Sequence, residues 1–101
     1  MTLTLTVRIK PRARREINAA AAWWSENRLA APGAVAQDLN EALRLLVEFP
    51  GIGTKVENTK SSETRRWFLK RIGHHVYYRS RGSVLEVVAF WGSDREHGPS
   101  V

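Results

Sequence analysis

Hydrophobic and polar residues at the start of the chain alternate with the period of a β-strand. Every second residue from 3 to 9 is apolar, which predicts a strand with one buried face. From Pro11 onward, apolar residues recur at spacings of three and four until about residue 28, a pattern typical of an amphipathic helix. A second helical pattern begins near Val35 and stops at Phe49 and Pro50. The short breaker between the two patterns predicts an antiparallel helical hairpin.

The second half of the chain is rich in strand signals. Residues 64–71, 74–80 and 83–91 are rich in aromatic and β-branched residues, and Gly73 and Gly82 lie between them, which predicts an antiparallel meander. Polar residues 54–63 are predicted to form a long loop. The chain is therefore predicted to be one α+β domain over residues 1–101. An N-terminal strand and a helical hairpin would pack on a small antiparallel sheet, in the order β-α-α-β-β-β.

Composition narrows the class of protein. Sixteen Lys and Arg against ten Asp and Glu give a net charge of +6, which favours an acidic partner such as nucleic acid or an acidic protein. The absence of cysteine excludes disulfides and thiolate nucleophiles. No segment has the pattern of a signal peptide or a membrane span, so a cytoplasmic protein that does not bind membranes is expected.

The positive charge is concentrated in residues 55–81. This segment contains eight Lys and Arg but only two acidic residues, Glu57 and Glu63. Its net charge therefore equals that of the whole chain. One interpretation is that these charges sit at strand ends and sheet edges, where they discourage aggregation. The other is an electropositive sheet face for phosphate or an acidic segment. The six aromatic residues of the meander are either core residues or side chains on which nucleic-acid bases stack.

Candidate catalytic groups are few. His74 and His75 are adjacent, and neighbouring strand residues point to opposite faces, so the two imidazoles are not expected to act together. Asp94, Glu96 and His97 do not have the spacing of a metal site. No nucleophile elbow and no phosphate-binding loop is present. Neither a cofactor nor a metal is therefore expected, and the residues alone indicate a basic α+β binding domain.

The order of landmarks along the chain adds a family resemblance. The landmarks are Ala22-Trp23-Trp24 late in the first helix, Leu39 to Pro50 followed by Gly53, then Thr64 to Trp67, His74 to Arg79, and Val87 to Trp91 with Arg95 behind. Over nearly the whole chain this order resembles the RelE/ParE superfamily of toxins from bacterial type II toxin–antitoxin modules, and within it the ParE branch. The resemblance implies a cognate ParD-like antitoxin that wraps the toxin in a hetero-oligomeric complex. It also implies DNA gyrase as the target, poisoned by binding rather than by catalysis.

The ribonuclease branch of the superfamily gives the alternative function, a ribosome-dependent messenger RNA endonuclease. Cleaving RNA requires a base, an acid and cations around the phosphate. By position, Arg66 and Arg95 match basic sites of that branch, His75 stands where an arginine is usual, and Phe68 replaces a lysine. With His97 as a further base candidate, the ribonuclease hypothesis uses Arg66, His75, Arg95 and His97. The replacement at Phe68 favours gyrase poisoning.

Two sets of binding residues follow from these hypotheses. Residues 96–101 are expected to form a second region for contact with the target. The residues expected to bind the target are Arg65, Arg66, Lys70, Arg71, Arg79, Arg95 and His97. Those expected to bind the antitoxin are Trp23, Arg66 and Arg79. A third interpretation keeps the fold but assigns no toxic activity.

Overall fold

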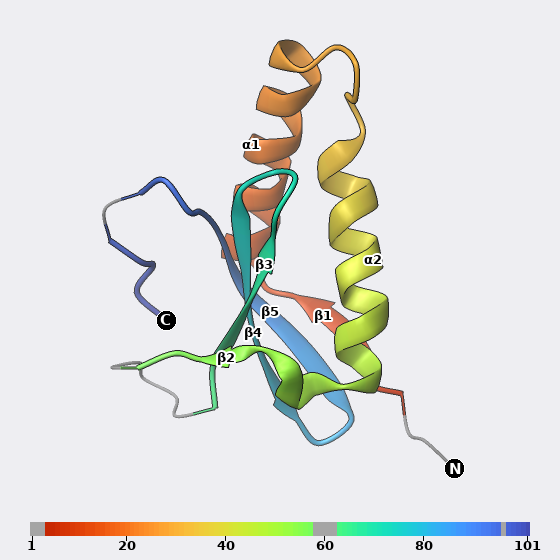
Figure 1. The fold of residues 1–101 in the computed structure, drawn as a ribbon. Helices are drawn as coiled ribbons and strands as arrows, with labels where there is room; N and C mark the ends of the chain where they lie inside the picture. Colours follow the sequence, from red (N-terminus) through yellow and green to blue (C-terminus); the bar gives the residue numbers. More distant parts are fainter. Residues whose placement is uncertain (1–3, 58–62, 96) are drawn as a thin grey trace.

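The computed structural model describes residues 4–57, 63–95 and 97–101, and it is a two-layer α+β structure (Figure 1). Helices α1 (Pro11–Asn27) and α2 (Ala34–Glu48) form an antiparallel hairpin on one face of a five-stranded sheet. The sheet has the order β1-β5-β4-β3-β2. The strands are β1 (Thr6–Ile9), β2 (Thr54–Lys55), β3 (Arg65–Leu69), β4 (His74–Arg81) and β5 (Val84–Gly92), and the short 3₁₀ helix η1 (Pro50–Ile52) follows α2.

The predicted α+β class and the helical hairpin are confirmed, but the sheet is mixed rather than wholly antiparallel. β1 runs parallel to β5, with Thr6 opposite Val84, whereas the other neighbouring strands are antiparallel. Alternation along a sequence reports a strand and its faces but contains no information about the direction of its neighbour. The expected loop at 54–63 also contains the short strand β2, which pairs with Arg65 and Arg66. Residue 3 and residues 58–62 lie outside the described residues.

The hydrophobic core lies between the hairpin and one face of the sheet. Pro11 occupies the first turn of α1, where its missing N–H costs no hydrogen bond. The apolar sides of the two helices meet the sheet along one seam, which is buried, whereas Trp24 is only partly buried and packs against the core. The seam residues Ile17, Val35, Leu39, Leu43 and Leu46 belong to one cluster with the strand residues Val76, Tyr78, Leu85, Val87 and Phe90.

A β-bulge in β5 sets which residues face the helices. Tyr78 pairs with Val87 and Tyr77 with Ala89, so Val88 is an extra residue between them. Because of this insertion, Val87 and Phe90 both belong to the core although they are three residues apart. We call the face turned away from the helices the outer face. By register and alternation it contains Arg66, Phe68, His75, Tyr77, Arg79, Glu86, Ala89 and Trp91.

In the part of the chain that the structure describes, neither helix has the length and apolar character needed to cross a membrane.

Candidate functional site

The outer face carries a basic and aromatic group of residues where β3 and β4 pair. Phe68 lies opposite His75, with ring centroids 4.9 Å apart, and Arg66 lies opposite Tyr77. Phe68 is 46% exposed. Burial lowers the pKa of His75, and the charges of Arg66 and His74 lower it further. His75 is therefore held neutral at physiological pH, able to accept a proton or a hydrogen bond.

The adjacent His74 lies on the other side of the sheet. Its ring stacks on Phe90 with a centroid separation of 4.8 Å, and its Nδ1 lies 2.9 Å from the carbonyl oxygen of Ile72. Phe90 belongs to the core between helices and sheet. The two histidines therefore face opposite surfaces, as the strand pattern predicts, and only His75 belongs to the outer face.

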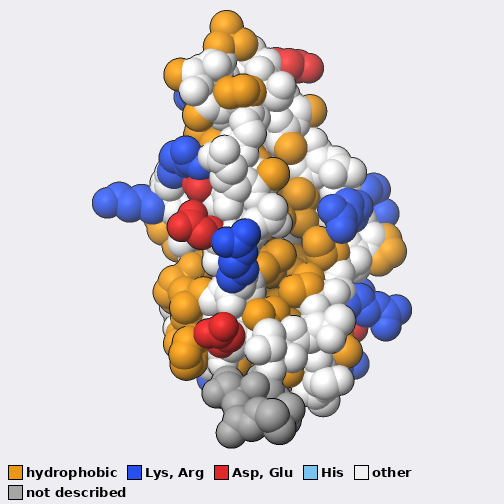
Figure 2. All heavy atoms as spheres, turned by 90° about the vertical axis from the view of Figure 1, so that its right-hand side faces the viewer, with side chains coloured by type: hydrophobic (Ala, Val, Ile, Leu, Met, Phe, Trp, Pro, Cys, Tyr) orange, Lys and Arg blue, Asp and Glu red, His pale blue; other side chains and the backbone are white. Residues whose placement is uncertain are grey.

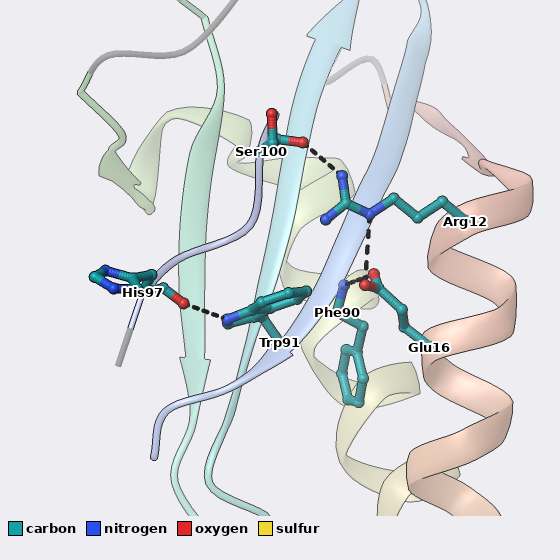
Figure 3. A network of polar contacts seen from close by, with 6 residues as sticks. All are labelled: Arg12, Glu16, Phe90, Trp91, His97 and Ser100. Atoms are coloured by element: carbon teal, nitrogen blue, oxygen red, sulfur yellow. Dashed lines mark hydrogen bonds and ion pairs between the residues drawn. The ribbon is translucent and has the colours of Figure 1, made fainter. Parts of the chain in front are cut away.

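Trp91 of β5 connects the outer face with the C-terminal segment (Figure 3). It pairs with His75 across β4 and β5. The Arg95 guanidinium lies 4.0 Å from the centroid of the Trp91 ring, in cation–π contact. The indole Nε1–H donates a hydrogen bond to the His97 carbonyl at 2.7 Å. Arg66 and His75 thus lie on the outer face, whereas Arg95 contacts Trp91 and also lines a groove with Glu16 and His74 on the α1 side.

Arg79 also lies on the outer face, but it belongs to a buried ion pair. Its Nε donates to Oε1 of Glu86 at 2.9 Å, and Lys10 and Arg81 approach the same carboxylate at 3.6 and 3.8 Å. Glu86 is only 7% exposed, and the hydrogen bond from Arg79 lowers its pKa. The sequence analysis did not identify Glu86 as the partner of Arg79. Glu86 is the one charged residue of β5, and a single charge in an apolar strand is a signal of a buried ion pair.

The remaining predicted basic residues lie elsewhere. Arg65 donates to the Gly53 carbonyl at 2.8 Å and so fastens β3 to the segment after η1. Arg71 binds both carboxylate oxygens of Asp38 on α2, at 2.9 and 2.6 Å, and this contact raises its pKa. Lys70 is exposed at the end of β3, beside grooves between the hairpin and the sheet. The seven expected target-binding residues therefore do not form a single surface.

Trp23 lies in a groove on the hairpin side. The groove, of about 500 Å³, runs between α1 and the β3–β4 turn. Trp23 is 49% exposed, and the guanidinium of Arg28 lies 5.1 Å from its ring centroid and 5.8 Å from that of Trp24. A second groove, of about 270 Å³, runs between α2 and β3 and includes Leu45 and Phe68.

The surface on the α2 side of the molecule is mixed in character. Figure 2 shows hydrophobic side chains reaching the surface through the middle of this side, between separate groups of Lys and Arg. On α2 and just after it, Leu45, Phe49 and Ile52 are 38%, 52% and 44% exposed. Exposed apolar groups rimmed by charges are typical of protein-binding surfaces.

The chemistry available on the outer face is limited. Among the described residues, no group of three or more His, Asp or Glu is placed to hold a metal ion. A neutral imidazole beside a guanidinium can accept a proton near a phosphate, and His75 with Arg66 provides that pair. Next to His75, Phe68 presents an apolar ring. This part of the outer face therefore combines one imidazole, one guanidinium and one exposed apolar ring.

Comparison with known proteins agrees with this geometry. A model of the family described as "ParE toxin of type II toxin-antitoxin system, parDE" matches residues 7–97. A solved structure titled "Chromosomal ParDE TA system from P. aeruginosa" is similar with a TM-score of 0.71 and 16% identity, over 90% of this chain and 98% of that chain; this likeness shows a shared fold. No curated protein matches the sequence. Because the family model spans most of its length, the chain belongs to the ParE toxin family of type II toxin–antitoxin systems.

Proposed function

We propose that this protein poisons DNA gyrase by binding through its outer face, and that a cognate ParD-like antitoxin neutralises it in a cytoplasmic hetero-oligomeric complex. The supporting observation is that Arg66 on this face and Arg95, which lies against Trp91 of this face, are both exposed. Neither takes part in the ion pairs found for Glu16, Asp38 and Glu86. Guanidiniums in such positions can contact phosphate or an acidic surface, and the ring of Trp91 lies against Arg95.

Arg79 lies on this surface but is not available for a direct contact with the target. Its guanidinium is held by Glu86 and its side chain is only 18% exposed, so a partner would have to break a buried ion pair to use it. Arg65 and Arg71 likewise have acceptors within the protein. The proposed target contact therefore narrows to Arg66 and Arg95.

The hairpin side is proposed to bind the antitoxin. Trp23 is half-exposed beside Arg28 and Lys70, for which no ion-pair partner is found in the described chain. An acidic and apolar antitoxin segment would complement this groove and the positive net charge of the toxin. Trp23→Ala is expected to weaken antitoxin binding, measured by calorimetry. Unchanged affinity would remove Trp23 from the interface.

The direct test of the target is a cleavage assay with purified gyrase and supercoiled DNA. The protein should increase the fraction of DNA trapped in the cleaved complex. Replacing Arg66 and Arg95 by Gln should reduce this effect at least tenfold, because each charge-assisted contact contributes about 1.5–3 kcal/mol. Arg44→Gln, on the exposed side of α2, removes one positive charge from the opposite layer and is the matched control for each of the two single substitutions. No trapped DNA with the unmodified protein would reject gyrase as the target.

A second candidate is the ribosome-dependent ribonuclease, favoured by the neutral His75 beside Arg66. It requires site-specific cuts in transcripts on translating ribosomes. His75→Ala combined with His97→Ala should abolish those cuts. Gyrase poisoning predicts that no such cuts occur with the unmodified protein.

A further inference from the structure

The C-terminal residues return over the outer face instead of extending away from it. Trp91 donates its indole N–H to the carbonyl of His97, and Arg12 of α1 donates to the carbonyl of Ser100 (Figure 3). Between these two contacts, a Cβ added to Gly98 would lie 3.5 Å from the hydroxyl of Tyr77. We call residues 97–100 the strap.

The strap passes beside Tyr77, which is shielded from water. Tyr77 is on the outer face and is not part of the core cluster beneath the helices. It is nevertheless only 3% exposed, and the backbone at Gly98 passes beside its hydroxyl. A large aromatic ring on the proposed target face is therefore covered by the chain itself.

The strap is held by weak interactions. Both hydrogen bonds are accepted by backbone carbonyls of the strap, and both donors, Trp91 and Arg12, are side chains of other elements. His97, Gly98 and Ser100 are exposed, and Pro99 has no N–H with which to extend a strand ladder. Two side-chain hydrogen bonds, offset by the cost of ordering four residues, hold such a segment only part of the time.

We propose that the strap closes the outer face around Tyr77 and Trp91 and must leave before a partner can contact these rings. The inference rests on the proposed function for the identity of that partner, gyrase. The strap itself is defined by its contacts within the chain. Because a partner binds only the open fraction, the strap lowers the apparent affinity for gyrase by the inverse of that fraction. Freeing it should raise the affinity about tenfold, the factor that one net hydrogen bond of about 1.4 kcal/mol provides.

Two variants release the strap by different routes. A chain ending at Arg95 removes the strap and leaves the Arg12–Glu16 contact of α1 in place. Arg12→Gln keeps the strap but removes both the charged donor to Ser100 and the cation–π contact of Arg12 with Trp91, whose ring centroid lies 5.7 Å from the guanidinium. Arg14→Gln is the control, because Arg14 is exposed in the same helical turn and has no contact with the strap among the described residues.

The first readout is hydrogen exchange of the Trp91 indole N–H by NMR, which requires no partner. Exchange should accelerate at least fivefold in the shortened chain and in Arg12→Gln, and should be unchanged in Arg14→Gln. Unchanged exchange in the first two variants would show that the strap does not cover Trp91 and would overturn the proposal.

The second readout is the affinity of each chain for gyrase. An increase of about tenfold in both variants is expected. Equal or weaker binding by the shortened chain would overturn the proposal, because the strap would then be neutral or would itself contact the target. If even the unmodified chain fails to bind gyrase, the proposed target is wrong, whereas the exchange data still decide whether the outer face is covered.

Discussion

The carboxylate of Glu16 on α1 accepts a hydrogen bond from the backbone N–H of Phe90 on β5 at 2.9 Å. β1 pairs only with residues 84–87 of β5, so the N–H of Phe90 lies beyond the end of that ladder. A helix side chain thus takes the place of a missing strand partner. The same carboxylate pairs with Arg12, which holds the strap, so α1 both protects the sheet edge and positions the C-terminal segment.

Glu16→Ala is expected to destabilise the fold by about 1–2 kcal/mol, because the N–H of the buried Phe90 loses its acceptor. Urea unfolding at neutral pH measures this change. Glu26→Ala, on the exposed surface of the same helix, is the control and should change stability by less than about 0.5 kcal/mol. Equal effects of the two substitutions would show that the Glu16 contact contributes nothing to stability.

Gly53 is required by its close approach to β3 and β4. Its N–H donates to the Tyr78 hydroxyl at 3.0 Å, and an added Cβ would lie 2.4 Å from that oxygen and 2.8 Å from the carbonyl of Arg66. Gly53→Ala should therefore cost about 1–3 kcal/mol through steric overlap. Gly51→Ala is the matched control, because nothing lies within 4 Å of its added methyl group. Thermal unfolding of the two variants in parallel would contradict this account if Gly53→Ala were the more stable.

The Glu86 cluster makes stability depend on pH at the acidic end. The pKa of Glu86 is lowered in the folded state, mainly by the hydrogen bond from Arg79. Its contribution is therefore fully present above the ordinary carboxyl pKa of 4.5 and is lost as the pH falls through the lower folded value. Glu86→Gln should cost about 1–3 kcal/mol at pH 7, and the difference from the unmodified protein should shrink below pH 4.5. A difference that is constant with pH would contradict the ion-pair explanation.

His75 provides a test of the electrostatics of the outer face. Its pKa is lowered from the ordinary 6.5, first by burial and then by Arg66. As the pH falls below 6.5, the unfolded chain takes up this proton before the folded one, so stability decreases with falling pH in that range. NMR titration should show Arg66→Gln raising the His75 pKa only partly toward 6.5, because burial remains. An unchanged value would show that Arg66 does not act on His75.

The sequence predicts the parts of this protein that depend on local periodicity. Both helices, the seam residues such as Leu39 and Leu46, and the opposite directions of His74 and His75 follow from spacings of three, four and two residues. The parallel pairing of β1 and the short strand β2 do not follow, because both depend on which distant segment lies alongside.

The same distinction applies to the candidate site. Arg66 and His75 can be assigned to one face by alternation, and the structure places them there. Arg71 pairs with Asp38 on α2, and Arg79 pairs with Glu86 on β5. No spacing rule connects Arg71 with Asp38, which is 33 residues away. The basic residues of 55–81 therefore look alike in sequence but are divided in the structure between ion pairs within the protein and exposed positions.

Incorporation of labelled thymidine and labelled methionine, followed minute by minute after induction in a bacterium without antitoxin, tests the central claim. Gyrase poisoning predicts that DNA synthesis falls first, with filamentation and a DNA-damage response. It also predicts that the Arg66→Gln, Arg95→Gln double variant, folded to the same extent, loses this effect while Arg44→Gln retains it. Protein synthesis falling first would contradict the account and favour the ribonuclease, and loss of neither would show that the chain is not toxic.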